Sequence, residues 1–178
     1  MKNSQGLALR NEYTRLVGLF QGAWASLELT TDYAIGQFLN VTHEQCHLIT
    51  AGMMFGRKSR LLADLIKRSD HPQKSKILEP FNKIRGMSKR DVFAHGYIRG
   101  DAESVTFLER AAGGEFKATE HTFTFMEFQI HVATIAKLAT EFYEALGCTR
   151  EQVSDFANAA LSLNRKSKKS PETPKSRA

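Results

Sequence analysis

The chain has 178 residues, of which 42% are hydrophobic and 25% are charged, a composition that fits one compact domain with a buried core. Its formal charge of +6 is concentrated at the end, because residues 165–178 carry six basic residues and one acidic residue, or +5. Residues 1–164 therefore carry only about +1, which argues against a strongly basic nucleic-acid-binding body. No apolar run approaches the roughly 20 residues that span a bilayer, which argues against a membrane protein.

The cysteines and the N-terminal region indicate the compartment. Cys46 and Cys148 stand far apart with no C-x-x-C spacing, and charged residues interrupt the first thirty positions, where a secretory signal needs an apolar core. We therefore expect a cytoplasmic protein with reduced thiols. Residues 165–178 contain two prolines and no large apolar residue, so a disordered basic tail is expected to follow a helical domain at 1–164.

The first half of the chain shows helical periodicity. Apolar residues recur at intervals of three and four along residues 9–39, which predicts one long helix. Thr42 followed by Gln45 is a capping-box pattern, so a second helix is expected from there to Ser69. A third helix is expected after Pro72 and toward Gly96, a residue typical of helix ends. We expect these three helices to form the core.

The period of the apolar residues then changes from about 3.6 to about 2. The stretches SVTFLER and EFKATEHTFTF flank Ala-Ala-Gly-Gly, which predicts a β-hairpin across about residues 104–124. The fold class expected from these patterns is mainly α, an antiparallel helical bundle with a small β-hairpin insert.

Two further capping boxes mark the helices after the hairpin. Thr124 with Glu127 opens a fourth long helix, which is expected to end at Gly147. Thr149 with Gln152 opens a last short helix before the tail. The sequence therefore predicts five helices and one hairpin.

One candidate site is HEQCH, residues 43–47, which matches the H-E-x-x-H pattern of zinc hydrolases. His43 would directly follow the Thr42 cap, at a helix end that frays, whereas two zinc ligands need rigid support. Glu44 is also explained by the favourable helix dipole at that end. A zinc hydrolase that uses His43 and His47 is therefore the less favoured alternative, and no metal or other cofactor is expected.

The other candidate site is RDVFAHGY, residues 90–97. A guanidinium such as that of Arg90 neutralises phosphate charge through a bidentate fork, and an imidazole such as that of His95 can accept a proton from a ribose 2′-hydroxyl. These two functions are what RNA cleavage without metal requires. The alternative is purely structural: His95 would then be a cationic residue at a helix C-terminus, and Arg90 a solvated surface residue.

RDVFAHGY resembles the R-x4-6-H motif of HEPN domains, compact helical bundles that often form dimers and often act as metal-independent endoribonucleases. The resemblance implies catalytic roles for Arg90 and His95, with Asp91 as the polar residue that follows the arginine. Tyr97 matches the longer R-x4-H-x-Y form found in HEPN toxins, in which a partner nucleotidyltransferase can modify the tyrosine. The partners implied are RNA, a second copy of the chain and an antitoxin protein.

Two more residues are candidates for a supporting role. Glu28 falls on the inner side of the first helix by its spacing from Trp24 and Ile35, so its carboxylate needs a partner, either Arg90 or a local donor. Lys58 belongs to a basic run that is either a solvated face or a contact for phosphate. The leading function is therefore RNA cleavage, and the alternative is a HEPN-like module that binds RNA or protein without cleaving anything.

Overall fold

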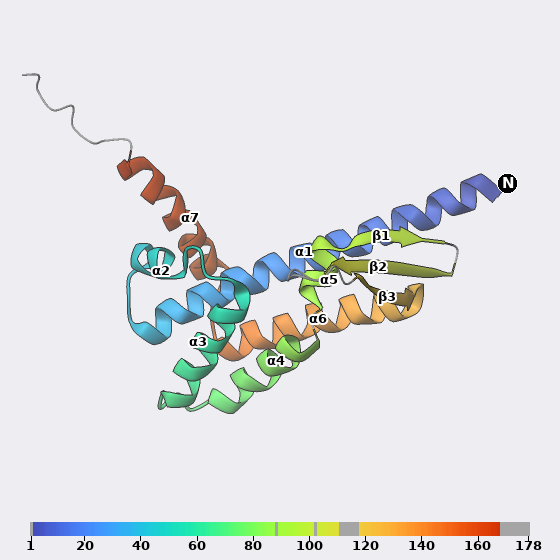
Figure 1. Ribbon diagram of the computed structural model, residues 1–178. Helices are drawn as coiled ribbons and strands as arrows, with labels where there is room; N and C mark the ends of the chain where they lie inside the picture. Colours follow the sequence, from blue (N-terminus) through green and yellow to red (C-terminus); the bar gives the residue numbers. More distant parts are fainter. Residues whose placement is uncertain (1, 88, 102, 111–117, 168–178) are drawn as a thin grey trace, which may run out of the picture. The chain divides into compact units, whose positions relative to one another are not determined.

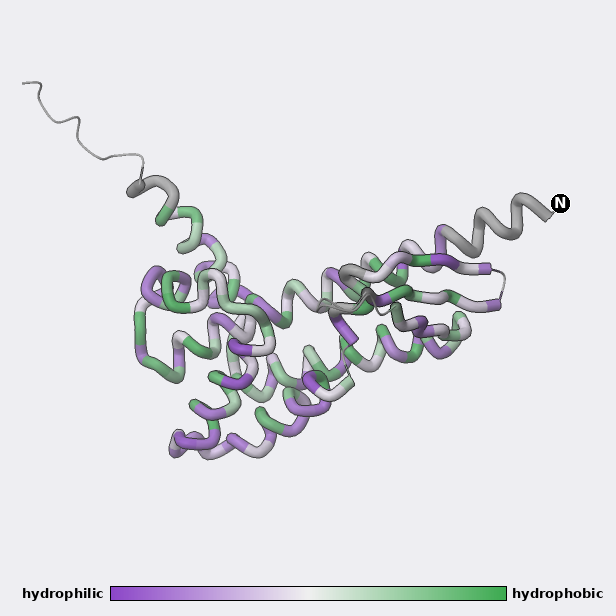
Figure 2. Tube along the Cα trace, viewed as in Figure 1, coloured by the Kyte–Doolittle hydropathy of each residue, from purple (hydrophilic) through white to green (hydrophobic). Residues whose placement is uncertain are grey.

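The computed structural model describes residues 2–87, 89–101, 103–110 and 118–167, which are mainly helical with one small antiparallel sheet (Figure 1). The elements in chain order are α1 (Lys2–Leu39), α2 (His43–Thr50), α3 (Phe55–Arg68), α4 (Lys74–Met87), α5 (Arg90–His95), β1 (Tyr97–Gly100), β2 (Ser104–Arg110), β3 (Ala118–Thr124), α6 (Phe125–Leu146) and α7 (Arg150–Ser167). The predicted fold class, mainly α with a small β insert, is confirmed. Hydrophobic and hydrophilic residues alternate along the helices, as the sequence periodicity requires (Figure 2).

The chain divides into two compact units, each built from two separate stretches of sequence. The first unit comprises Met1–Leu27 and Ser75–Ala145, and the second comprises Glu28–Lys74 and Leu146–Ala178. The first unit contains the N-terminal part of α1, most of α4 and α6, and all of α5 and the sheet. The second contains the rest of α1 together with α2, α3 and α7, and in this unit α2 packs against α7.

Aromatic side chains form the core of the first unit. The Phe93 ring lies 4.9 Å from that of Phe20, 4.8 Å from that of Phe107 and 5.3 Å from that of Phe128, between ring centroids. All four side chains are buried. Such edge-on and tilted aromatic pairs each add about 0.5–1.5 kcal/mol beyond the area they bury, so this cluster fixes how α5 and the sheet pack.

The sheet has the strand order β1-β2-β3, with both pairs antiparallel. The predicted hairpin is therefore confirmed as β2 and β3, and its Ala-Ala-Gly-Gly connection lies outside the described residues. The sequence did not predict β1, which pairs Tyr97 with Leu108 and Gly100 with Val105. Its four residues are all exposed, so the burial that produces an alternating pattern is missing.

Two of the predicted helices are each divided in two. The expected helix from Thr42 to Ser69 stops at Thr50 and restarts at Phe55, because Gly52 between them takes a left-handed backbone with φ +75°. The expected helix toward Gly96 stops at Met87 and restarts at Arg90, after Lys89 with φ 43° and ψ 34°. Apolar periodicity continues across both breaks, which is why the spacing alone predicts single helices.

The helix ends were predicted more accurately. The capping boxes Thr42 with Gln45 and Thr149 with Gln152 both form, with a hydrogen bond in each direction. The box at Thr124 forms in the same way with Glu127. Gly147 follows α6 with φ +68°, the left-handed conformation of a helix stop.

α7 extends to Ser167, past the expected start of the tail at residue 165, and the remaining residues of the predicted tail lie outside the described part of the chain. Among the residues described, none of the helices is both long enough and apolar enough to cross a bilayer.

The turn between β1 and β2 generates a testable pH dependence. Hydrogen bonds from the backbone N–H groups of Glu103 and Ser104 lower the pKa of Asp101 below its usual 3.8. An acid with a lowered pKa stabilises the folded state above its unfolded pKa and loses this contribution as the pH falls through its folded pKa. Asp101→Asn should therefore lower the melting temperature at pH 7, and its difference from the wild type should shrink as the pH falls below 3.8 toward the folded pKa.

Circular dichroism melts between pH 2.5 and 8 would measure this dependence. Glu103→Gln is the matched control, because it removes a neighbouring charge and keeps the Asp101 carboxylate. A loss of melting temperature for Asp101→Asn that is the same at every pH would contradict the assignment.

Candidate functional site

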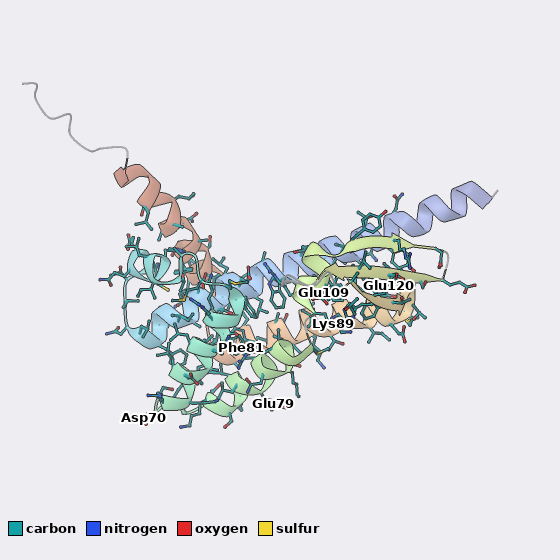
Figure 3. The ribbon with its side chains drawn as sticks, viewed as in Figure 1. Asp70, Glu79, Phe81, Lys89, Glu109 and Glu120 are labelled. Carbon is teal, nitrogen blue, oxygen red and sulfur yellow. The ribbon has the colours of Figure 1, made fainter. Side chains whose placement is uncertain are left out.

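The candidate motif forms α5 and the first residue of β1. Lys89 precedes the helix in a left-handed conformation, and its Nζ lies 5.2 Å from the centre of the Phe123 ring; Figure 3 labels Lys89. The Phe93 N–H donates to the Lys89 carbonyl oxygen over 3.1 Å, and the Gly96 N–H donates to that of Val92 over 2.9 Å. Arg90 and His95 are therefore the first and last residues of a helix of six residues.

The middle of α5 is anchored in the core of the first unit. Val92 is 5% exposed and Phe93 only 2% exposed, and both lie between the two candidate catalytic positions. The Gln21 side-chain amide donates to the Phe93 carbonyl oxygen over 3.4 Å. The two buried residues hold the backbone between the candidate positions in place. A fixed backbone of this kind is what a catalytic pair requires.

The end of α5 depends on a glycine. Gly96 has φ −68° and ψ 140°, which any residue adopts, so backbone freedom is not the reason for a glycine here. A Cβ atom at this position would lie 2.4 Å from the Val92 carbonyl oxygen and 3.4 Å from Phe107 Cβ. Gly96 therefore permits the chain to leave α5 and enter β1 without a clash.

Arg90 and His95 lie five positions apart, which corresponds to about 140° of azimuth and about 7.5 Å of rise on an ideal helix. The Arg90 side chain is half-buried and its Nε atom is enclosed by protein. Asp91 lies on the same helix, between Arg90 and Val92. The structure thus brings Arg90, Asp91 and His95 onto one short element.

Tyr97 follows directly as the first residue of β1, and its side chain is 66% exposed. The nearby Arg99 guanidinium pairs with the Glu120 carboxylate over 2.8 Å across the sheet. Tyr97 therefore offers an accessible hydroxyl on the same segment as Arg90 and His95, whereas the charge of Arg99 is already paired.

Glu28 and Lys58 belong to the second unit, whereas Arg90 belongs to the first. The Lys58 ammonium donates to the Asp32 carboxylate over 2.7 Å, and both side chains are only 14% exposed. Lys58 therefore neutralises a carboxylate of its own unit. Sequence reasoning missed this partner, because 26 positions separate the two residues.

The surroundings of this ion pair are poorly solvated. Burial raises the pKa of Asp32, although the hydrogen bond and charge of Lys58 oppose the shift and Glu28 adds to it. Burial, together with the charge of Asp32, also raises the pKa of the Cys46 thiol to about 11. The Cys46 Sγ lies 3.0 Å from the Asp32 carbonyl oxygen, so this thiol is a protonated donor and a poor nucleophile at neutral pH.

The HEQCH histidines lie within the packing of the second unit. His47 Nε2 lies 2.7 Å from the Phe156 carbonyl oxygen, and because a carbonyl only accepts, this nitrogen carries a proton. The His47 ring also stacks on the Phe156 ring at 4.0 Å, and the His43 ring meets the same ring edge-on at 5.5 Å. In the described part of the chain no three His, Cys, Asp or Glu side chains are grouped to hold a metal ion.

The role of Lys58 can be tested by stability. Asp32→Asn leaves a mostly buried ammonium without its carboxylate, so it should destabilise the fold by about 1–3 kcal/mol. The double variant Asp32→Leu/Lys58→Met, which removes both charges, should recover much of that loss. Urea denaturation followed by circular dichroism measures the difference.

Glu79→Gln is the matched control for this test. It breaks the exposed Glu79–Lys83 pair, whose two side chains are 69% and 58% exposed (Figure 3 labels Glu79), and it should leave the urea midpoint unchanged. If Asp32→Asn were as stable as the wild type, Lys58 would again be a candidate for contact with phosphate.

Comparisons with known proteins add no further assignment. No family model matches the chain, and searches of curated proteins and of solved structures returned no significant match.

Proposed function

We propose that this protein is a metal-independent endoribonuclease of the HEPN type, with Arg90 and His95 as its catalytic residues. The observation that carries the proposal is that these two residues bound a single short helix, which Val92 and Phe93 anchor in the core. The R-x4-H-x-Y pattern of RDVFAHGY supports it from the sequence. Anchoring of this kind fixes the spacing of a base and an anion-binding group before the substrate arrives.

The proposed reaction is a transesterification within the RNA. His95 accepts the proton of a ribose 2′-hydroxyl, and the resulting oxygen attacks the adjacent phosphorus while the bond to the 5′-oxygen breaks. Arg90 stabilises the charge that develops on the phosphoryl oxygens, and Asp91 orients one of the two groups. The leaving 5′-oxygen takes a proton from water, and His95 releases the proton it accepted to the solvent, so the products are a 2′,3′-cyclic phosphate and a 5′-hydroxyl end.

The remaining site residues have different roles in this proposal. Tyr97 is exposed and follows the catalytic helix, so it is the acceptor for modification by a partner nucleotidyltransferase if the protein is a toxin with an antitoxin. Lys58 does not contact phosphate, because Asp32 already pairs with it. Glu28 keeps the supporting role that its spacing predicts, and its charge adds to the raised pKa of Asp32.

The two residues should respond differently to substitution. His95→Ala should abolish cleavage and leave RNA binding nearly unchanged, because a neutral imidazole contributes little to phosphate affinity. Arg90→Ala should weaken binding and lower the rate about a hundredfold or more, since a positioned donor in such a site contributes about 2–4 kcal/mol to the transition state. One gel series on mixed RNA with EDTA present measures both effects.

Arg150→Ala is the matched control for Arg90. Arg150 is an exposed arginine at the start of α7 in the second unit, so its loss should change neither cleavage nor folding. If wild type and both site variants leave RNA uncut but bind it or a protein partner equally, the catalytic proposal fails and the binding module takes its place. Cleavage lost on addition of EDTA and restored by zinc would instead favour the HEQCH motif.

The proposed enzyme is a two-fold dimer that brings two Arg90/His95 pairs together, using α4 and the end of α5 so that one patch meets itself. Light scattering should give a mass of about twice 20.0 kDa at micromolar concentration. A purely monomeric sample that still cleaves RNA would show that one copy of the pair is sufficient.

A further inference from the structure

The second unit contains a pocket of about 450 Å³ that the proposed cleavage does not use. It is formed by the C-terminal part of α1, the segment after α3, and the junction of α6 and α7. This volume lies in the range of about 300–1,000 Å³ that is typical of small-molecule sites. Six side chains that carry its chemistry are Tyr33, Gln37, Phe38, His71, Cys148 and Gln152.

The lining residues include no lysine, arginine, aspartate or glutamate. Burial raises the pKa of the Cys148 thiol, so this group is also neutral at neutral pH. A charged ligand would lose its hydration here without gaining a counter-charge, so the pocket favours a neutral one.

Aromatic rings and hydrogen-bonding groups occur together on the wall. The Phe38 and His71 rings meet at 5.9 Å between centroids with an angle of 60° between their planes, and Tyr33 adds a third ring. Aromatic walls of this kind favour flat ligands, which stack on the face of one ring or meet the edge of another. The pocket therefore suits a planar ring better than a flexible chain.

The polar groups are held in defined orientations. His71 Nδ1 accepts a hydrogen bond from the Gln73 N–H over 3.2 Å, so the proton of the neutral ring is on Nε2 and can be donated. Gln152 Oε1 accepts from the Thr149 N–H over 2.8 Å, so the amide NH₂ is the part of this lining side chain that can donate to a ligand. The wall thus offers fixed donors that match ring nitrogens or ring carbonyls.

We propose that this pocket binds a neutral aromatic heterocycle with hydrogen-bond acceptors on its ring, such as a purine base. The ring could arrive as a free molecule or as an unstacked base of a nucleic acid, and the chemistry of recognition is the same in both cases. This inference rests on the pocket alone and does not depend on cleavage by Arg90 and His95.

The test uses Cys148 as a reporter in the intact wild-type chain. Alkylation by iodoacetamide is followed by peptide mass spectrometry at pH 8, with Cys46 as an internal control because its side chain is only 1% exposed. Adenine at about 5 mM should slow Cys148 alkylation about threefold or more, as expected for a dissociation constant of about 2.5 mM or less. Indole, which is flat but has no ring acceptor, should protect Cys148 less than adenine does.

Two further probes define the ligand. Adenosine monophosphate should protect no better than adenine, because the lining offers no cation for its phosphate. An oligoadenylate that protects Cys148 at lower concentration than adenine would identify a nucleic acid as the source of the ring. Equal or weaker protection would identify a free molecule as the source. The proposal holds in both cases.

Substitutions of lining residues provide a separate test. His71→Leu and Gln37→Ala should each reduce protection by adenine. Gln129→Ala should not, because Gln129 is an exposed residue of α6 in the first unit.

Several results would overturn the proposal. Absence of protection by adenine in the wild type would show that the pocket does not take such a ring. Equal protection by indole and adenine that survives His71→Leu would show a merely apolar pocket. Much tighter binding of adenosine monophosphate than of adenine would show that phosphate is the recognised group.

Discussion

The packing of one side chain, Phe93, is the constraint on which the first unit depends. Its ring contacts residues from α1, the sheet and α6, and its backbone carbonyl accepts from Gln21 of α1. A six-residue helix is far too short to be stable by itself, so α5 exists because Phe93 and Val92 are buried there. The spacing between Arg90 and His95 is thus a product of tertiary packing. The same burial that holds the fold together also sets the geometry of the candidate site.

The ion pairs of the two units differ in their exposure to water. In the second unit, Lys58 and Asp32 are removed from water together, and the cost of burying each charge is offset by the other. The pocket in the same unit has no lysine, arginine, aspartate or glutamate in its lining. In the first unit the ion pairs at Glu79–Lys83 and Arg99–Glu120 lie on the surface, where water and salt weaken them. The Lys58–Asp32 pair of the second unit is therefore structural, whereas the two exposed pairs of the first unit add little to stability.

The sequence predicted local features well and tertiary ones poorly. The three capping boxes, the helix stop at Gly147 and the strands β2 and β3 follow from signals within a few residues. The breaks at Gly52 and Lys89 were missed because periodicity reports which side of a helix is buried and not whether the backbone is continuous. The strand β1 was missed because its four exposed residues are ordered by pairing with β2.

In the candidate site, too, local features were predicted from the sequence and tertiary contacts were not. The motif at residues 90–97 correctly placed a helix end between His95 and Gly96. The spacing of Glu28 predicted a side chain on the inner side of its helix, and the residue is half-buried in the structure. The partner of Lys58 could not be predicted, because an ion pair between α1 and α3 depends on how two helices pack. The pocket could not be predicted either, because its lining residues come from three separate stretches of the chain.

Lys89, which directly precedes α5, combines a conformational cost with a favourable contact. A non-glycine residue with φ 43° bears a conformational cost of about 1 kcal/mol, and a cation above an aromatic face returns about 0.5–1 kcal/mol at an exposed site. These two terms nearly cancel, so the turn between α4 and α5 is close to neutral in its own energetics. Another non-glycine residue at position 89 would keep the conformational cost and lose the contact with Phe123, whereas glycine would remove the cost and the contact together. Lysine and glycine are therefore the residues that suit this position best.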